Sequence, residues 1–133
     1  MSTDTMTIRE MCDAFDVTPR TLRFYEAKEL LFPIRKGQKR LFTRRDRARL
    51  KLILRGKRFA FSLEEIRQLL NLYEPGNGQA TQLARTLELA GGHLRDMEDR
   101  RRELDDAIGE LRAQMNLVTE MLNDVSASSR AAE

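Results

Sequence analysis

The chain has 133 residues, with 24 Lys and Arg, 21 Asp and Glu, and a formal net charge of +3. This length gives one modest core with an appendage, and the single cysteine, Cys12, excludes an internal disulfide and fits a reducing compartment. Because the sequence shows no apolar signal region and no run of the ~18–20 apolar residues that a membrane span requires, we expect a cytoplasmic protein with no membrane partner.

The charge is unevenly distributed along the chain. Residues 1–60 carry 16 basic and 7 acidic side chains, whereas residues 61–133 carry 8 and 14. Twelve basic residues lie between Arg35 and Arg58, against a single acid, Asp46. The clustering predicts a basic module for an anionic polymer, joined to an acidic element with another task. A solvated surface that is merely uneven is the alternative.

Two short helices are predicted at the start of the chain. Thr7 and Glu10 form a capping-box pattern, and Asp16-Val17 makes a tight turn before the next helix. That helix opens at Thr18 with Pro19 at its first position, where a missing N–H costs nothing. The apolar stripe of the first helix consists of Ile8, Met11, Cys12 and Phe15. Helices joined this closely form a helix-turn-helix, whose second helix usually enters the major groove.

The second helix has a packing face and an arginine face. Arg20 and Arg23 are three residues apart and share one face, whereas Leu22 and Tyr25 share another, on which they can pack. A short basic helix with these two faces predicts binding to duplex DNA.

The same helix supplies the first candidate contacts. Arg20 and Arg23 are the candidates for groove contacts, since arginine can bind guanine with two hydrogen bonds. Thr18 and Tyr25 are candidates for donation to nearby phosphates, which positions a protein on DNA without reading its sequence. For Tyr25, a packing role with the hydroxyl at the surface is an equal alternative.

A basic hairpin is predicted after the second helix, because Pro33 stops helical continuation. Ile34-Arg35 and Arg40-Leu41-Phe42 flank Lys36-Gly37-Gln38-Lys39, which places a glycine in the turn. A basic hairpin beside a helix-turn-helix is a wing. We expect Arg40, together with Lys36 and Lys39, to hold the flanking DNA backbone.

A helix pair is predicted next. Residues 43–46 cap the first helix of the pair and residues 62–65 form a capping box for the second, with residues 59–61 between them as an aromatic plug in the core. The apolar residues of the pair are Ala48, Leu50, Leu52, Ile53, Leu54, Leu63, Ile66, Leu69 and Leu70. For Arg44, Arg45, Lys57 and Arg58, a solvated face and contact with phosphate both remain open. Pro75-Gly76-Asn77-Gly78 then breaks the chain, so we expect a DNA-binding domain over 1–74 and a linker over 75–82.

A heptad pattern follows over residues 83–125. Twelve of its 13 core positions are apolar, a strong coiled-coil signal. The positions are Leu83, Leu87, Ala90, Leu94, Met97, Arg101, Leu104, Ile108, Leu111, Met115, Val118, Leu122 and Val125. A continuous helix of this length spans roughly 65 Å and cannot bury its stripe against so small a domain, so it is predicted to pair with a second copy. Residues 126–133 are predicted to be a flexible tail.

Two features weaken this seam locally. Gly91-Gly92 lower helix propensity by roughly 1 kcal/mol each. Arg101 places a charge at a core position, and it either extends past the seam to Glu98 or Asp105 or fixes register, as buried polar residues in coiled coils can.

The order of helix-turn-helix, wing, helix pair, break and long helix over residues 7–125 resembles the MerR family of bacterial transcription regulators. The resemblance is carried by residues 18–26, Leu30-Leu31, Pro33, residues 40–42 and residues 61–66. Residues 46–73 resemble a narrower, LiuR-like branch that controls genes of branched-chain amino acid and acyl-CoA breakdown. The sequence departs from the family at Ala60, where glycine is frequent, and at Gln38-Lys39, where a glycine-tyrosine pair is common.

The resemblance implies a mainly α fold, in which a winged helix-turn-helix DNA-binding domain precedes a long coiled-coil dimerisation helix. It also implies a homodimer with antiparallel long helices and one recognition helix in the major groove at each half of a palindromic promoter site. Regulators of this family bend and untwist the DNA there, which costs several kcal/mol. The implied partners are therefore double-stranded promoter DNA, a second copy of the chain and RNA polymerase at the promoter.

No catalytic, metal or cofactor site is predicted. The thiolate ligands of metal-sensing relatives are missing near the end of the long helix, Cys12 lies on an apolar stripe, and His93 is alone. These residues leave no nucleophile–base pair for an enzyme. Met97, Met115 and Met121 line either an apolar ligand groove or a packed seam.

The identity of an effector cannot be read from these residues. A small effector would bind near residues 74–82 or between the coiled coil and the DNA-binding domain. The alternative function is an architectural or adaptor protein that binds DNA non-specifically and recruits a partner through its coiled coil.

Overall fold

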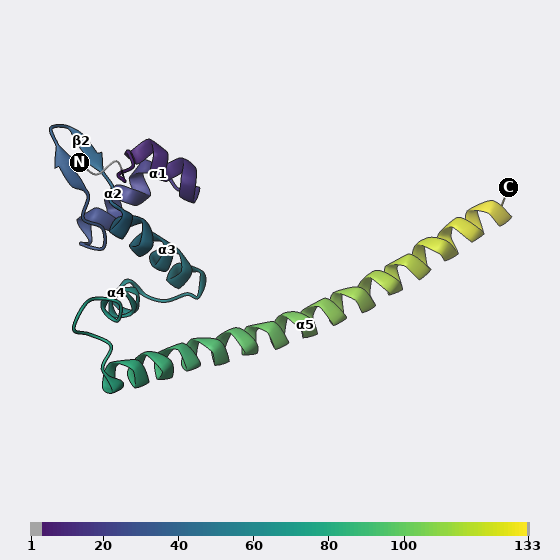
Figure 1. Ribbon diagram of the computed structural model, residues 1–133. Coiled ribbons are helices and arrows are strands. Elements are labelled where there is room, and N and C mark those ends of the chain that lie inside the picture. Colours follow the sequence, from purple (N-terminus) through teal and green to yellow (C-terminus); the bar gives the residue numbers. More distant parts are fainter. Residues whose placement is uncertain (1–3, 133) are drawn as a thin grey trace. The chain divides into compact units, whose positions relative to one another are not determined.

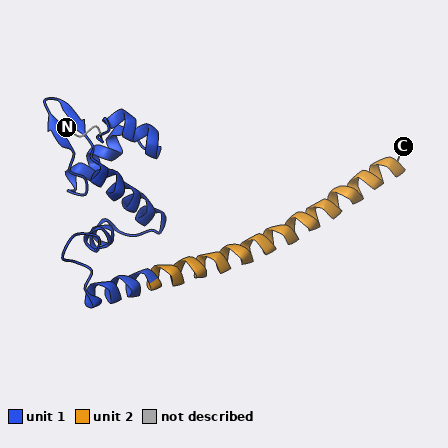
Figure 2. Ribbon diagram, in the orientation of Figure 1, with its two compact units in different colours: residues 1–90 blue, residues 91–133 orange. Residues whose placement is uncertain are grey.

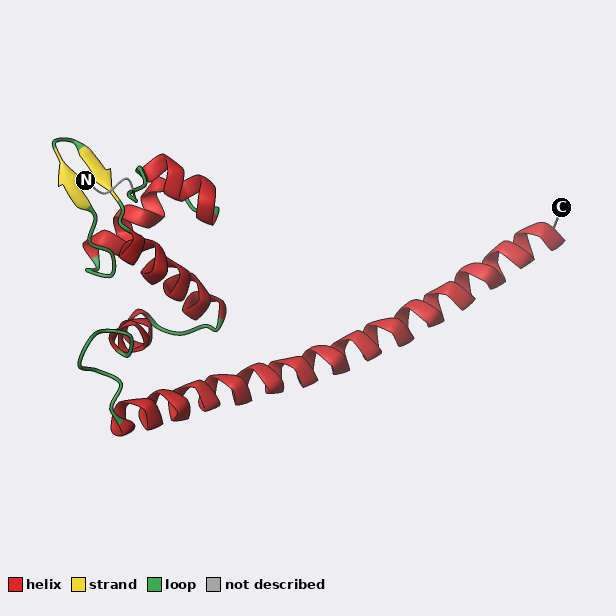
Figure 3. Ribbon diagram, in the orientation of Figure 1, coloured by secondary structure: helices red, strands yellow, loops and turns green. Residues whose placement is uncertain are grey.

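The computed structural model describes residues 4–132, which form five helices and a two-stranded sheet (Figure 1). In chain order the elements are α1 (Ile8–Phe15), α2 (Pro19–Ala27), β1 (Ile34–Lys36), β2 (Lys39–Leu41), α3 (Arg44–Arg58), α4 (Leu63–Asn71) and α5 (Ala80–Ala131). The mainly α fold with a small hairpin and a long C-terminal helix is confirmed (Figure 3).

The first four helices begin where capping residues place them. Thr7, Thr43 and Ser62 each accept a hydrogen bond from the backbone three residues later, and the acid at that position accepts one in return. Thr18 caps α2, and Pro19 occupies its first position. The three predicted capping patterns and the predicted start of α2 are therefore confirmed, since each depends only on neighbours in sequence.

The hairpin is also confirmed. β1 and β2 pair antiparallel in the register Ile34↔Leu41, Arg35↔Arg40 and Lys36↔Lys39. Gly37 in the turn has φ +63°, which glycine adopts without steric cost. Phe42 continues beyond β2 and exchanges two 2.8 Å backbone hydrogen bonds with Met6.

One apolar core holds α1 to α4 and the hairpin together. Its buried members are Met11, Leu22, Tyr25, Leu30, Leu31, Phe42, Leu50, Ile53, Ile66 and Leu70. The predicted aromatic plug is only partly correct, because Phe61 packs against this core whereas Phe59 is 38% exposed. Phe59 caps the C-terminal end of α3 at the surface, where its ring meets that of Phe61 edge-on at 5.9 Å.

The chain divides into two compact units, residues 1–90 and residues 91–133 (Figure 2). The first contains α1 to α4, the hairpin and the beginning of α5, and the second consists of the rest of α5. Residues 80–82 of the predicted linker and residues 126–131 of the predicted tail are helical. The reason is that the helix-breaking residues lie at 75–78, and residues 126–131 contain neither Gly nor Pro. The domain boundaries remain predictions.

The heptad seam of α5 is exposed to solvent in the single chain. Its large apolar side chains are between 39% and 75% exposed, from Ile108 to Leu87. The guanidinium of Arg101 lies 4.0 Å from the carboxylate of Glu98 on the same helix, which is one of the two arrangements expected for it. Within residues 4–132, no helix is both long and apolar enough to cross a membrane.

Candidate nucleic-acid interface

The cap of α2 fixes where its arginines point. The Thr18 hydroxyl oxygen accepts a 3.2 Å hydrogen bond from the Thr21 N–H and lies 2.9 Å from the Thr21 hydroxyl. Leu22 is buried, whereas Arg20 and Arg23 are exposed. Within the described part of the chain, neither guanidinium makes a hydrogen bond or an ion pair. Both charges are therefore available to an anionic partner.

Tyr25 lies in the core and does not reach the predicted phosphate contact. Its side chain is 1% exposed, and its hydroxyl is buried with no hydrogen-bond partner among the described residues. The prediction that Tyr25 donates to DNA therefore does not fit this structure, and neither does a hydroxyl at the surface. The position three residues after Leu22 places both side chains on the buried face of α2.

Arg40 holds the wing against α2. Its Nε donates a 2.6 Å hydrogen bond to Oε2 of Glu26, and Nε of Arg35 donates a 3.2 Å bond to Oε1 of the same carboxylate. The side chain of Arg40 is half-buried in this contact. Glu26 on the neighbouring helix therefore competes with phosphate for this guanidinium, and contact of Arg40 with the DNA backbone stays a prediction.

The tip of the wing keeps its positive charge. Lys36 and Lys39 face each other across the last pair of the hairpin and are exposed. In the part of the chain that the structure describes, neither ammonium has an acidic partner. Both charges are therefore available to an anionic partner, and contact of the two lysines with phosphate stays a prediction.

The basic residues of α3 fall into two groups. Arg44 forms a 2.6 Å ion pair with Asp4, and Arg45 forms a 2.5 Å pair with Glu74. Lys57 and Arg58 at the other end of α3 are exposed and form no such pair with a described residue. Of the four residues left open by the sequence, only these last two carry uncompensated charge.

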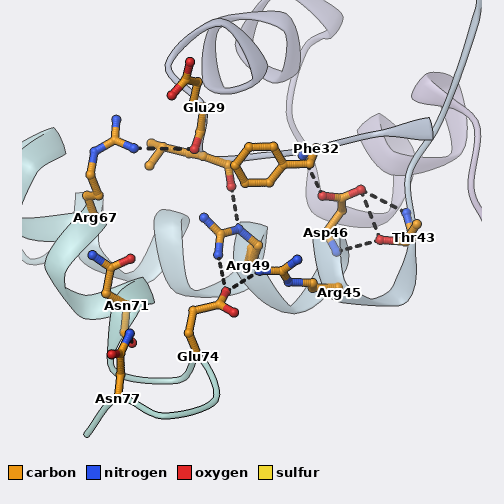
Figure 4. A network of polar contacts seen from close by, with 11 residues as sticks. Glu29, Phe32, Thr43, Arg45, Asp46, Arg49, Arg67, Asn71, Glu74 and Asn77 are labelled. Carbon is orange, nitrogen blue, oxygen red and sulfur yellow. Dashed lines mark hydrogen bonds and ion pairs between the residues drawn. The ribbon is translucent and has the colours of Figure 1, made fainter. Parts of the chain in front are cut away.

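The end of α2 is held by an arginine of α4. Arg67 donates a 2.6 Å hydrogen bond to the carbonyl of Lys28. Its other terminal nitrogen lies 3.5 Å from the carbonyl of Glu29, as Figure 4 shows. A cation at these carbonyls also complements the negative end of the helix dipole. Sequence reasoning missed this contact, since 38 or more residues separate its partners.

The loop from α2 to β1 is held by two charged residues of α3. Arg49 donates a 2.7 Å hydrogen bond to the Leu30 carbonyl, and Asp46 accepts a 2.9 Å bond from the Phe32 N–H. Both α3 residues are buried, and burial lowers the pKa of Arg49, with the charge of Arg45 adding to this effect. A signal existed in the sequence: the spacing of Asp46, Arg49 and Ile53 places two charges on the apolar face of α3.

One cavity, one cysteine and three methionines are the features that bear on binding of an effector or a metal. A cavity of about 480 Å³ lies beside the predicted linker, lined mostly by apolar side chains that include Leu52, Leu70 and Tyr73. Cys12 is half-buried, and burial raises the pKa of its thiol. Within residues 4–132, no group of three or more His, Cys, Asp or Glu side chains could hold a metal ion. Met97, Met115 and Met121 are exposed on α5.

Two family models match the chain. One is described as MerR HTH family regulatory protein and matches residues 6–72, and the other as MerR, DNA binding, and matches residues 47–114. The chain is 40% identical over 67 residues to the HTH-type transcriptional regulator ZntR of Escherichia coli, covering 49% of this chain and 48% of ZntR. It thus spans about half the length of this relative. It is 29% identical over 105 residues to the regulator CueR of the same species, covering 74% of this chain and 78% of CueR.

Solved structures give the same fold. The transcription regulator PbrR691 from Ralstonia metallidurans, in complex with lead(II), is 31% identical with a TM-score of 0.60, covering 80% of this chain and 85% of that one. A regulator from Bacillus cereus is 26% identical with a TM-score of 0.62, covering 80% and 78%. HiNmlR, a regulator lacking the sensor domain and bound to promoter DNA, is 24% identical with a TM-score of 0.61, covering 76% and 79%. At that identity the last likeness shows the fold alone.

Proposed function

This chain belongs to the MerR family of regulatory proteins. We propose that it is a transcriptional regulator and not an enzyme, and that it binds a palindromic promoter site as a homodimer. The observation that carries this proposal is the pair of exposed, unpaired arginines, Arg20 and Arg23, on a capped helix beside a basic wing. Charges left without internal partners on a rigid element suit recognition of an anionic polymer.

In the proposed complex the interface residues have three roles. Arg20 and Arg23 enter the major groove, where arginine reads guanine. Thr18, Lys36 and Lys39 bind phosphates, and Lys57 and Arg58 can extend this contact. Arg40 acts indirectly, by holding the wing on α2 through Glu26.

The homodimer forms through α5. Eleven large apolar side chains of the heptad seam are exposed in the single chain: Leu83, Leu87, Leu94, Met97, Leu104, Ile108, Leu111, Met115, Val118, Leu122 and Val125. An apolar stripe along so long a helix favours pairing with an identical helix. Antiparallel pairing gives the dimer the twofold symmetry that a palindromic site requires.

The proposed mode of action follows from likeness to the family. The dimer bends and untwists the promoter, and RNA polymerase then uses the distorted site. Control of amino-acid or acyl-CoA degradation genes is proposed from the LiuR-like pattern of residues 46–73 alone.

The test is a salt-controlled gel shift with the variant Arg23→Ala. We expect the affinity for the bound promoter duplex to fall by about tenfold or more, since a good arginine–guanine pair contributes about 1–3 kcal/mol. The melting temperature should change little, because the guanidinium forms no hydrogen bond or ion pair with a described residue. The control is Arg112→Ala on α5, which removes the same charge far along the sequence. Unchanged affinity for Arg23→Ala would contradict the assignment.

Footprinting separates this function from an architectural one. A single protected palindrome supports a promoter regulator, whereas even protection along the duplex supports non-specific binding. In both cases affinity should fall as salt is added, because phosphate neutralisation releases counterions, so salt dependence alone does not discriminate.

A further inference from the structure

We infer that Glu74 and Arg49 position the recognition helix relative to the wing, and thereby set DNA specificity without touching DNA. Glu74 lies in the connector between α4 and α5, and Arg49 lies in α3 (Figure 4). The inference rests on the proposed function, in which α2 and the wing bind one DNA half-site together.

The loop between α2 and β1, residues 28–33, is fixed through its backbone. The Lys28 carbonyl accepts a 2.6 Å hydrogen bond from Arg67 of α4, and the Leu30 carbonyl accepts a 2.7 Å bond from Arg49 of α3. The Phe32 N–H donates a 2.9 Å bond to Asp46 of α3. The angle between the recognition helix and the wing depends on this loop. Charged groups of α3 and α4 therefore help to set this angle, together with the burial of Leu30 and Leu31 in the loop itself.

Arg49 is a buried guanidinium with three partners, Leu30, Glu74 and Phe32. It is 9% exposed, donates through Nε to Leu30 and through Nη1 to Glu74 at 2.9 Å, and lies over the Phe32 ring at 5.3 Å. A buried guanidinium requires a counter-charge, and removing that partner leaves a costly unpaired charge. Loss of the Glu74 charge leaves Asp46 as the remaining acid acting on Arg49, and this weakens the hold of Arg49 on the Leu30 carbonyl.

Glu74 is itself held in the connector. Its backbone carbonyl accepts a 3.1 Å hydrogen bond from the Asn77 N–H, and the Asn77 side chain donates a 2.9 Å bond to the Asn71 carbonyl at the end of α4. Polar contacts thus run without a break from the connector, through Glu74 and Arg49, to the Leu30 carbonyl. A change at the connector must either move Arg49 or break its pair.

Arg45 provides an internal control. It donates a 2.5 Å hydrogen bond to the same oxygen of Glu74, but its side chain is 62% exposed and forms no hydrogen bond or ion pair with residues 28–33. Removing Arg45 therefore leaves the chain from Glu74 to Leu30 complete, whereas removing the Glu74 charge breaks it.

The experiment measures a ratio of affinities. The unchanged full-length protein first selects a duplex from a random-sequence pool, and its affinity for that duplex is divided by its affinity for a scrambled duplex of equal length. We expect Glu74→Gln to lower this ratio by about tenfold, within the range usual for coupling between sites. Glu120→Gln, which makes the same charge change on α5, and Arg45→Met should keep the ratio within about twofold.

A second variant tests the same inference if the Glu74→Gln protein does not fold. Arg49→Lys keeps the charge but cannot reach Leu30 and Glu74 with a fixed fork of donors, and it should lower the ratio similarly. All affinities are measured well below the melting temperature of each variant, and a purely structural role would change both affinities equally. Folded Glu74→Gln or Arg49→Lys protein with an unchanged ratio overturns the inference. If the unchanged protein enriches no sequence, the proposed function itself fails.

Discussion

Glu26 in α2 accepts a 2.6 Å hydrogen bond from Arg40 in β2, and this pair docks the wing on the recognition helix. The same carboxylate also pairs with Arg35, which lies directly opposite Arg40 in the hairpin. Like charges directly opposite each other destabilise a strand pair. Glu26 therefore has two effects at once, since it offsets the repulsion within the wing and fixes the wing beside α2.

We expect Glu26→Gln to destabilise the protein by about 1–2 kcal/mol, because two half-buried or exposed guanidiniums lose their shared counter-charge. Urea unfolding at one protein concentration measures this change. Glu110→Gln, on the exposed surface of α5, is the control for net charge and should change the free energy of unfolding by less than about 0.5 kcal/mol. Equal effects of the two substitutions would contradict the docking role.

Tyr25→Phe should leave DNA affinity unchanged and stabilise the protein slightly. The buried hydroxyl has no hydrogen-bond partner among the described residues, and an unpaired buried polar group costs about 1–3 kcal/mol. Its removal should therefore raise the free energy of unfolding by up to about 1 kcal/mol. Paired gel-shift and unfolding measurements decide the matter, with the exposed Tyr73→Phe as reference. A clear loss of DNA affinity would instead support the contact between Tyr25 and phosphate that the sequence suggested.

Gly56→Ala should be destabilising because α3 and α4 approach closely there. A Cβ added at Gly56 would lie 2.8 Å from Cγ1 of Ile66, which is fully buried. Overpacking of this kind costs about 1–3 kcal/mol. Gly109→Ala on α5 meets nothing within 4 Å and gains about 1 kcal/mol from helix propensity alone. Thermal denaturation should therefore show melting temperatures that shift in opposite directions, or free energies of unfolding of the two variants that differ by at least about 1 kcal/mol.

Ala60→Gly should stabilise the turn that ends α3. Ala60 has φ +63°, and the chain reverses there through hydrogen bonds from the Ala60 and Phe61 N–H groups to the carbonyls of Lys57 and Gly56. A left-handed conformation costs alanine about 1–2 kcal/mol, whereas the extra freedom of glycine in the unfolded chain costs about 0.5–1 kcal/mol. We expect a net gain of about 0.5 kcal/mol from these opposing effects. Ala107→Gly inside α5 should instead lose about 1 kcal/mol.

The contribution of Glu74 should disappear at low pH. Hydrogen bonding from Arg45 is the main cause that holds the pKa of Glu74 below its ordinary value of 4.5, and Arg49 adds to it. A carboxyl whose pKa is lowered on folding stabilises the protein above its unfolded pKa, and this contribution is lost as pH falls through the folded pKa. The difference in unfolding free energy between the unchanged protein and Glu74→Gln should therefore shrink below pH 4.5. A difference independent of pH would exclude this ion pair as its source.

The sequence alone determined where most of the helices and the hairpin begin, and it indicated two exposed charges of the proposed interface. Capping patterns at Thr7, Thr18 and Ser62, the turn at Gly37 and the heptad seam depend on residues close together in the chain. Such local patterns act through neighbouring hydrogen bonds and helical periodicity, so they could be read without a structure. Arg20 and Arg23 were identified for the same reason, since their shared face follows from helical spacing.

Only the tertiary structure decided which polar groups are free and which are engaged. Tyr25 and Arg40 have suitable chemistry for DNA, but the core buries the first and Glu26 binds the second. Arg49 and Glu74 are 25 residues apart and meet because α3 and the connector come together in the fold. Pairings between residues distant in the chain depend on how the elements pack, and no periodicity in the sequence records them.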